Sequence, residues 1–94
     1  MKRSENETTN YNYFIKNESV MISAVDVLSV LSSNKKVILM AKGDLIPNAV
    51  AVANIVTENM LKGNSSIQDI KLDSVISEES GQMTSNIEIT LIKN

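Results

Sequence analysis

The chain has 94 residues, which is enough for one small domain with a single core, and a second domain is not expected. It contains neither cysteine nor histidine, which excludes disulfides, thiolate nucleophiles, imidazole bases and nearly all zinc sites. Its formal net charge of −2, from 9 Lys and Arg against 11 Asp and Glu, is unlike that of a strongly basic nucleic-acid-binding protein.

The first ten residues are polar and are predicted to form a disordered tail, 1–10, ahead of a single domain over residues 11–94. Lys2 and Arg3 are not followed by the apolar segment of a secretory signal. No window of the sequence has the roughly 18 apolar residues of a membrane span. The sequence therefore predicts a cytoplasmic protein without a membrane partner.

Alternating side chains predict a short strand over residues 11–16. Ser19 is the predicted N-cap of a helix that continues to about Ser32. Helical spacing places Val20, Ala24, Val27, Leu28 and Leu31 on an apolar side, and Ser23, Asp26, Ser29 and Ser33 on a polar side. The continuous apolar run of residues 37–40 then predicts a strand that is covered on at least one face, and possibly on both.

The sequence after this apolar run predicts a direct change from strand to helix. Gly43 permits backbone angles that other residues resist, and Asp44 can accept hydrogen bonds from the first helical turn. Pro47 is tolerated there because its missing N–H would have had no partner. The helix is predicted over about residues 45–61, and its only charged residue is Glu58. A surface helix normally has a wide charged face, so we expect this one to contact both the sheet and a second subunit.

Two further strands complete the predicted domain. Residues 67–76 form the first, with a bulge or a change of register, because Ile70 and Leu72 are out of phase with Ile67. Residues 86–91 alternate cleanly and form the second. The order β-α-β-α-β-β predicts an α+β fold built as a two-layer sandwich.

The sequence from about residue 13 to residue 93 resembles the Alba family of small archaeal chromatin and RNA-binding proteins. The strongest part is Ile-Leu-Met-Ala-Lys-Gly at residues 38–43, which is similar to the family's strand and its Lys-Ala-Arg-Gly loop. The likeness continues in the helix that follows, at Ile46, Asn48-Ala49-Val50 and Ile55-Val56, with weaker matches at residues 19–21 and 85–89. The combination is specific because its parts occur in order and at nearly the family's spacing.

This resemblance implies a fold like the C-terminal domain of translation initiation factor 3, in a dimer without catalytic activity or cofactor. Family members bind nucleic acid through the loops before the two helices and through β-hairpin arms, so the implied partners are double-stranded DNA or structured RNA. The implied localisation is nucleoid-associated. Carried over to this sequence, the nucleic-acid-binding residues are Lys16, Asn17, Lys42, Gly43 and Asn48. The predicted subunit interface consists of Val52, Ile55, Val56 and Met60.

Several basic positions of the family are lost in this sequence. Asn17 and Glu18 replace a Lys-Lys pair, and Lys42 replaces the loop arginine, which keeps the charge but not the bidentate fork. Asp44 replaces a basic residue after the loop glycine, and the hairpin connection at residues 78–83 is acidic. A fall from about eight phosphate contacts to about three per dimer weakens binding at physiological salt by orders of magnitude. We therefore expect weak intrinsic affinity.

Two other functions stay open at this point. The first is an interaction protein that does not bind nucleic acid but forms a heterodimer with a basic paralogue and modulates it, as the net charge and the acidic hairpin suggest. The second is an enzyme acting on RNA ends or phosphates, supported only by carboxylates such as Asp73 and Glu88 on neighbouring predicted strands.

Several of these residues also have a purely structural interpretation. Lys42 and Gly43 can also be interpreted as an ordinary exposed lysine and a turn glycine. Met60 can be interpreted as a residue that packs in the core or in a subunit interface. Glu78 and Glu79 are interpreted as solvated residues at a loop tip and not as a metal site, because no third oxygen ligand is close to them in sequence.

Overall fold

A computed structural model describes residues 11–94 of the chain, so the predicted tail over residues 1–10 lies outside the described part. The elements in chain order are β1 (Tyr11–Phe14), α1 (Val20–Asn34), β2 (Lys36–Lys42), η2 (Gly43–Leu45), α2 (Ile46–Ile55), η3 (Val56–Met60), β3 (Ser65–Ile76) and β4 (Met83–Lys93). The four strands form one sheet in the order β1-β2-β4-β3. The predicted α+β fold and its β-α-β-α-β-β order are confirmed.

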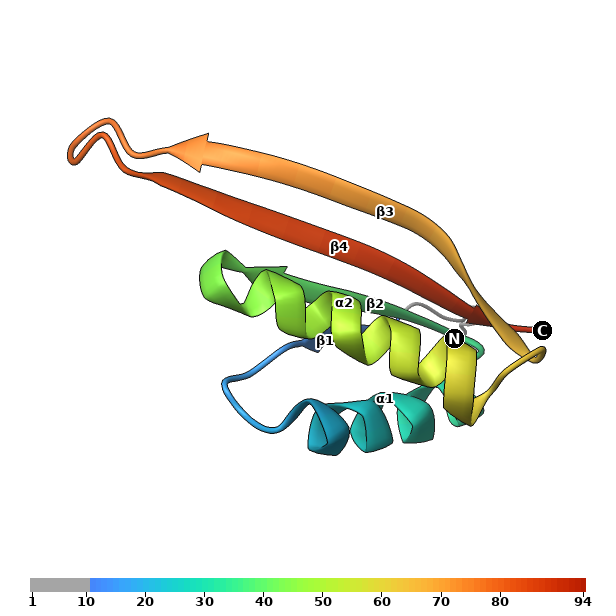
Figure 1. The fold of residues 1–94 in the computed structure, drawn as a ribbon. Helices are drawn as coiled ribbons and strands as arrows, with labels where there is room; N and C mark the ends of the chain where they lie inside the picture. Colours follow the sequence, from blue (N-terminus) through green and yellow to red (C-terminus); the bar gives the residue numbers. More distant parts are fainter. Residues whose placement is uncertain (1–10) are drawn as a thin grey trace, which may run out of the picture.

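Both helices pack on one face of the sheet, and the core lies between the two layers (Figure 1). Alternate residues of the central strands face the helices and are buried, namely Val37, Leu39 and Ala41 of β2 and Ile87, Ile89 and Leu91 of β4. The intervening residues Ile38 and Met40 are only half-buried on the opposite face. The apolar run that predicted β2 is therefore covered by helices on one face.

Helix α1 begins at the predicted cap, because the Ser19 hydroxyl accepts a hydrogen bond from the Met21 N–H at 3.2 Å. The helix continues two residues beyond Ser32 and ends where Lys35 adopts a left-handed conformation with φ of +66°. The predicted polar side was wrong at Ser23, which is only 1% exposed in the core. Its hydroxyl donates a hydrogen bond to the Glu18 carboxylate, so burial does not leave it unpaired.

The second helical segment starts and ends differently from the prediction. Residues 43–45 form a short 3-10 turn, α2 itself starts at Ile46, and its N-cap residue Leu45 makes no side-chain capping bond. Asp44 was therefore wrongly predicted as the cap, because the added 3-10 turn places it inside the helical segment. The last turn widens to a π-helix, closed by a hydrogen bond of 2.8 Å from the Leu61 N–H to the Val56 carbonyl.

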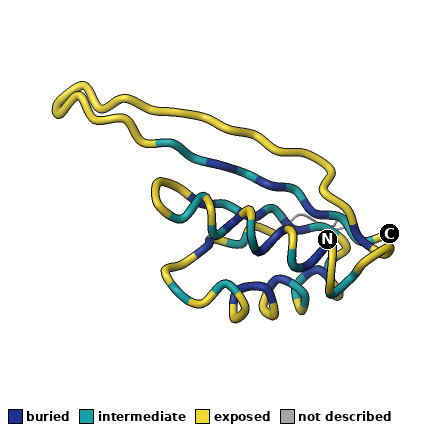
Figure 2. Tube along the Cα trace, viewed as in Figure 1, coloured by how far each residue is buried: buried dark blue, intermediate teal, exposed yellow. Residues whose placement is uncertain are grey.

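Strands β3 and β4 form a long hairpin that extends beyond the rest of the sheet (Figure 1). The predicted irregularity is present, since the register shifts between Ile67 and Asp69. Pairing between β2 and β4 stops at the Lys42–Asn86 pair, whereas β3 and β4 continue to pair up to their connecting turn. We call residues 74–85 the arm; Figure 2 shows that it is exposed along almost all of its length.

Candidate nucleic-acid interface

The loops that contain Lys16 and Lys42 lie at the same end of the sheet. Strand β1 is parallel to β2 and adjacent to it, with Phe14 opposite Met40, so both strands end on the same side. The Ile15 N–H donates a hydrogen bond of 2.9 Å to the Met40 carbonyl, which keeps the chains together beyond the last ladder pair. Lys16 follows β1, Lys42 is the last residue of β2, and both are exposed. Two lysines from separate loops thus come to one edge of the molecule.

Gly43 makes the change of direction from β2 into the helical segment. Its φ of +59° is left-handed. For a residue with a side chain this conformation costs roughly 1–2 kcal/mol. No atom lies within 4 Å of the position that a Cβ would occupy, so the conformation, not crowding, favours glycine here. The same open space leaves the backbone of Gly43 accessible beside Lys42.

Asn17 and Asn48 are the two asparagines of the predicted surface. Asn17 is exposed in the loop before α1. Asn48 is the third residue of α2 and is half-buried, so it has less free surface than the other four predicted residues, which are all exposed. The structure therefore brings Lys16, Asn17, Lys42 and Gly43 to the surface and leaves Asn48 partly covered.

Two acidic side chains near this edge are held by hydrogen bonds. The buried Ser23 hydroxyl donates to the Glu18 carboxylate at 3.2 Å, and the Tyr13 hydroxyl donates to the Asp26 carboxylate at 3.0 Å. Burial raises the pKa of the Tyr13 phenol above its ordinary value of 10.0, and the hydrogen bond to Asp26 raises this pKa further. Glu18 is thus held against α1, which restrains its negative charge in the loop that carries Lys16.

The arm carries no positive charge. From Leu72 to Ile92 the sequence contains four acidic residues, Asp73, Glu78, Glu79 and Glu88, and neither Lys nor Arg. Phosphate contacts depend mainly on Lys and Arg, so the arm offers no cation to a nucleic-acid backbone. The positive charge near this end of the sheet comes from Lys16 and Lys42 of the two loops and from Lys71 of β3, which lies outside the arm.

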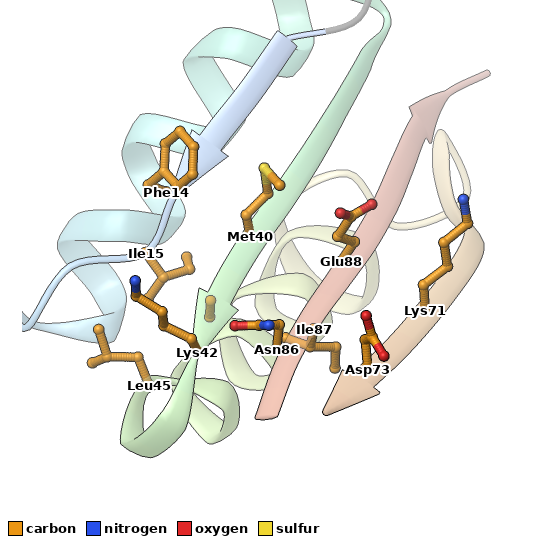
Figure 3. A pocket seen from close by; sticks show the side chains of 11 residues that line it. Phe14, Ile15, Met40, Lys42, Leu45, Lys71, Asp73, Asn86, Ile87 and Glu88 are labelled. Atoms are coloured by element: carbon orange, nitrogen blue, oxygen red, sulfur yellow. The ribbon is translucent and has the colours of Figure 1, made fainter. Parts of the chain in front are cut away.

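A cavity of about 510 Å³ adjoins Lys42, and Figure 3 shows its side chains spread over the four strands. The lining residues are Phe14, Ile15, Met40, Ala41, Lys42, Leu45, Lys71, Asp73, Asn86, Ile87 and Glu88. This cavity was not predicted, because its residues come from strands that are distant in sequence. The available signal was Phe14, an aromatic residue that alternates with Tyr13 and Ile15 and so has to face away from the core.

The four residues predicted to form a subunit interface are separated by the structure. Val52 and Val56 are both 0% exposed within the hydrophobic core, so they have no surface left for a partner. This part of the prediction is corrected: the two residues face the sheet of their own chain. Ile55 and Met60 pack against the core and remain partly exposed. For these two the interface stays a prediction.

Strand β3 carries exposed apolar residues that were not predicted to form an interface. Ile70 is 53% exposed and Leu72 is 70% exposed. They pair with Ile89 and Ile87 of β4, so they lie on the helix side of the sheet, where neither helix covers β3. The sequence indicated only that Ile70 and Leu72 face the same side of the strand after the register shift.

Among residues 11–94, no cluster of three or more acidic side chains is arranged to hold a metal ion. None of the helices in this range has the length and apolar character needed to cross a membrane.

Comparison with protein families shows where this fold belongs. The family model described as Alba matches residues 12–74, more than half of the 94-residue chain. The chain belongs to the Alba family. Alba proteins are nucleic-acid binders and not enzymes, so membership assigns the chain to the nucleic-acid-binding class. A search of curated proteins finds no match.

Two solved structures of Alba proteins share the fold. Alba from Thermoplasma volcanium is 29% identical, with a TM-score of 0.72, over 87% of this chain and 99% of that chain. ALBA1 from Trypanosoma brucei is 17% identical, with a TM-score of 0.71, over 93% of this chain and 72% of that chain. Since one of them is a trypanosome protein, the Alba fold of this chain does not imply an archaeal source.

Proposed function

We propose that this protein is a dimer that binds double-stranded DNA or structured RNA with weak intrinsic affinity, in association with the chromosome. Its phosphate-facing surface consists of Lys16, Asn17, Lys42, Gly43 and Asn48. The observation that carries the proposal is the position of the two lysines at one edge, after the adjacent parallel strands β1 and β2. Two ammonium groups at a common edge attract a phosphate backbone, and the open surface at Gly43 permits close approach.

The small number of cations sets the expected strength of binding. If Lys16 and Lys42 of each protomer neutralise one phosphate each, the dimer makes four contacts. The log–log dependence of affinity on salt then has a slope of about −3.6 on B-DNA. The arm adds repulsion, because it carries Glu78 and Glu79. Binding is therefore measurable at low salt and weak at physiological salt.

The exposed apolar residues of β3 support the dimer. An uncovered edge strand with large apolar side chains is an aggregation hazard unless another element covers it. Ile70 and Leu72 lie on the helix side of the sheet. The exposed Val50 of α2 lies on the same side. A second copy that presents the same patch around a two-fold axis buries β3 in both chains.

Charge reversal at Lys42 tests this function. The affinity of the wild type and of Lys42→Glu for a DNA duplex and for a structured RNA is measured from low salt upward. The variant is expected to lose affinity and about two units of salt slope, one for each protomer. Lys62→Glu is the matched control, because Lys62 is an exposed lysine after η3 and outside both loops. Equal affinities and slopes for the wild type and Lys42→Glu would show that the loop does not contact phosphate.

The absence of positive charge in the arm favours a second candidate, a heterodimer with a basic Alba paralogue. In this arrangement the paralogue supplies the phosphate contacts and this chain modulates them. Mixing the protein with a basic Alba protein is then expected to give heterodimers in preference to both homodimers. Native mass spectrometry distinguishes the three species, and a mixture without subunit exchange rules out this candidate.

A further inference from the structure

The sheet face turned away from the helices carries the cavity of about 510 Å³ beside Lys42. Phe14, Met40 and Glu88 form one row across β1, β2 and β4, because Phe14 lies opposite Met40 and Met40 lies opposite Glu88. Lys42 and Asn86 form the next row, two residues along the same strands, and so lie on the same face. The two rows place an aromatic ring, a thioether, a carboxylate, an amide and an ammonium group around one hollow (Figure 3).

The floor of this cavity suits a flat aromatic ligand. Phe14 is 63% exposed, whereas its neighbour Ile15 is buried on the helix side. An exposed ring on an open sheet provides a surface on which another planar ring stacks. The Met40 thioether lies directly beside it and makes favourable contacts with aromatic rings.

The rim of the cavity combines two cations, Lys42 and Lys71, with several hydrogen-bonding groups, and Lys71 lies opposite Glu88. Lys42 attracts a phosphate, the Glu88 and Asp73 carboxylates accept hydrogen bonds from amino groups, and the Asn86 amide both donates and accepts. A nucleotide carries these complementary groups in one molecule. The volume also lies within the range of about 300–1,000 Å³ that is common for small-ligand sites. A base inside a duplex is stacked and paired on the edges that this cavity would contact, so only an unpaired nucleotide fits.

We propose that this cavity binds an unpaired nucleotide of a nucleic-acid strand whose phosphate contacts Lys42. The proposal rests on the proposed function, because Lys42 takes part in both. The base stacks against Phe14 over Met40, and Glu88 accepts a hydrogen bond from an exocyclic amino group. The protein therefore prefers paired RNA with an unpaired extension to the same RNA without one, and cytosine to uracil in the extension, because uracil lacks the amino group.

Two RNAs and two substitutions on β1 test the cavity. The RNAs are a blunt duplex and the same duplex with a single-stranded cytosine extension, each titrated with the full chain by fluorescence anisotropy. The wild type is expected to bind the extended RNA about tenfold more tightly. Phe14→Leu keeps an apolar side chain but removes the ring, and it is expected to abolish this preference without changing the affinity for the blunt duplex. Phe14→Tyr retains the ring and is expected to keep the preference.

Tyr11→Leu is the matched control. Tyr11 is an exposed aromatic residue of the same strand, but it pairs with the buried Val37 and faces the helix side. The preference for the extended RNA is expected to survive this change. If the wild type binds both RNAs equally, or if Phe14→Leu keeps the preference, the cavity proposal is overturned, while binding of the blunt duplex still supports the proposed function. If the wild type binds neither RNA, the cavity proposal is overturned, and the proposed function is overturned as well if the protein does not bind a DNA duplex at low salt.

The hydrogen bond to the base has its own test. The extension is changed from cytosine to uracil, and the ratio of the two affinities is measured for the wild type and for Glu88→Gln. The wild type is expected to favour cytosine, and Glu88→Gln is expected to bring the ratio towards one. An equal affinity of the wild type for both extensions, or a preference that persists in Glu88→Gln, would overturn the assignment of Glu88.

Discussion

Leu72 lies directly opposite Ile87 across β3 and β4, yet Leu72 is 70% exposed and Ile87 is 4% exposed. Both side chains point to the helix side of the sheet. They differ because α2 packs over β2 and β4 and does not extend over β3. The structure of one chain thus leaves a large apolar side chain uncovered beside its own core.

This relationship predicts that Leu72→Glu dissociates the proposed dimer. A charge at the centre of an apolar contact has to be desolvated without a partner, which disfavours association. Sedimentation velocity is expected to show a dimer for the wild type and a monomer for Leu72→Glu. Val25→Glu is the control, since Val25 is 52% exposed on α1, away from β3. A variant at Leu72 that still sediments as a dimer would exclude β3 from the interface.

Truncation of a buried residue of α2 is predicted to act on folding and not on a partner. Val52 is 0% exposed, so Val52→Ala removes buried apolar surface and leaves a cavity. The loss is on the order of 2 kcal/mol in the free energy of unfolding, from about 0.8 kcal/mol per buried methylene and a cavity contribution. Urea unfolding measures it. Val50→Ala is the control at an exposed position of the same helix, and an equally small loss at both positions would contradict the packing of α2.

Gly43→Ala is predicted to lower the free energy of unfolding by backbone strain alone, at the point where β2 leads into the helical segment. A side chain fits in the open space, but the φ of +59° disfavours any L-residue, at a cost of roughly 1–2 kcal/mol. Gly81→Ala, at a φ of +72° in the arm's turn, is the matched control with similar strain. Urea unfolding should show comparable losses, whereas only Gly43→Ala should change nucleic-acid affinity. Equal effects of both variants on nucleic-acid affinity would show that Gly43 is not part of the interface.

Tyr13 is predicted to make folding stability depend on pH in the alkaline range. Burial and the hydrogen bond to Asp26 raise the pKa of Tyr13 above 10.0, so the folded state binds this proton more tightly than the unfolded chain. The stabilisation is complete below pH 10 and is lost as the pH rises through the folded-state pKa. The free energy of unfolding of Tyr13→Phe is expected to be lower than that of the wild type by at most about 1.5 kcal/mol near pH 8. Above the folded-state pKa of Tyr13, the difference between the two is expected to be smaller. Urea unfolding at several pH values measures this, with Tyr11→Phe as the control, and a constant difference across the range would contradict it.

Local signals in the sequence were sufficient to predict the helices and strands and several of their details. Ser19 caps α1 as predicted, because capping depends on one side chain and the first helical turn. The irregularity in β3 was visible because the phase of Ile70 differs from that of Ile67, and an extra residue is the local way to change phase. The cap predicted at Asp44 was wrong because a 3-10 turn and an α-helix begin with the same residue types.

The tertiary structure decided which of these residues meet. The sequence by itself determined the order of helices and strands, the α+β class and the resemblance to Alba, since these follow from periodicity, turn residues and short motifs. Only the parallel pairing of β1 with β2 brings Lys16 to the same edge as Lys42. Only the position of α2 over β2 and β4 buries Val52 and leaves Leu72 exposed. Periodicity tells which residues share a face, but burial depends on what covers that face, and contacts between distant segments decide this.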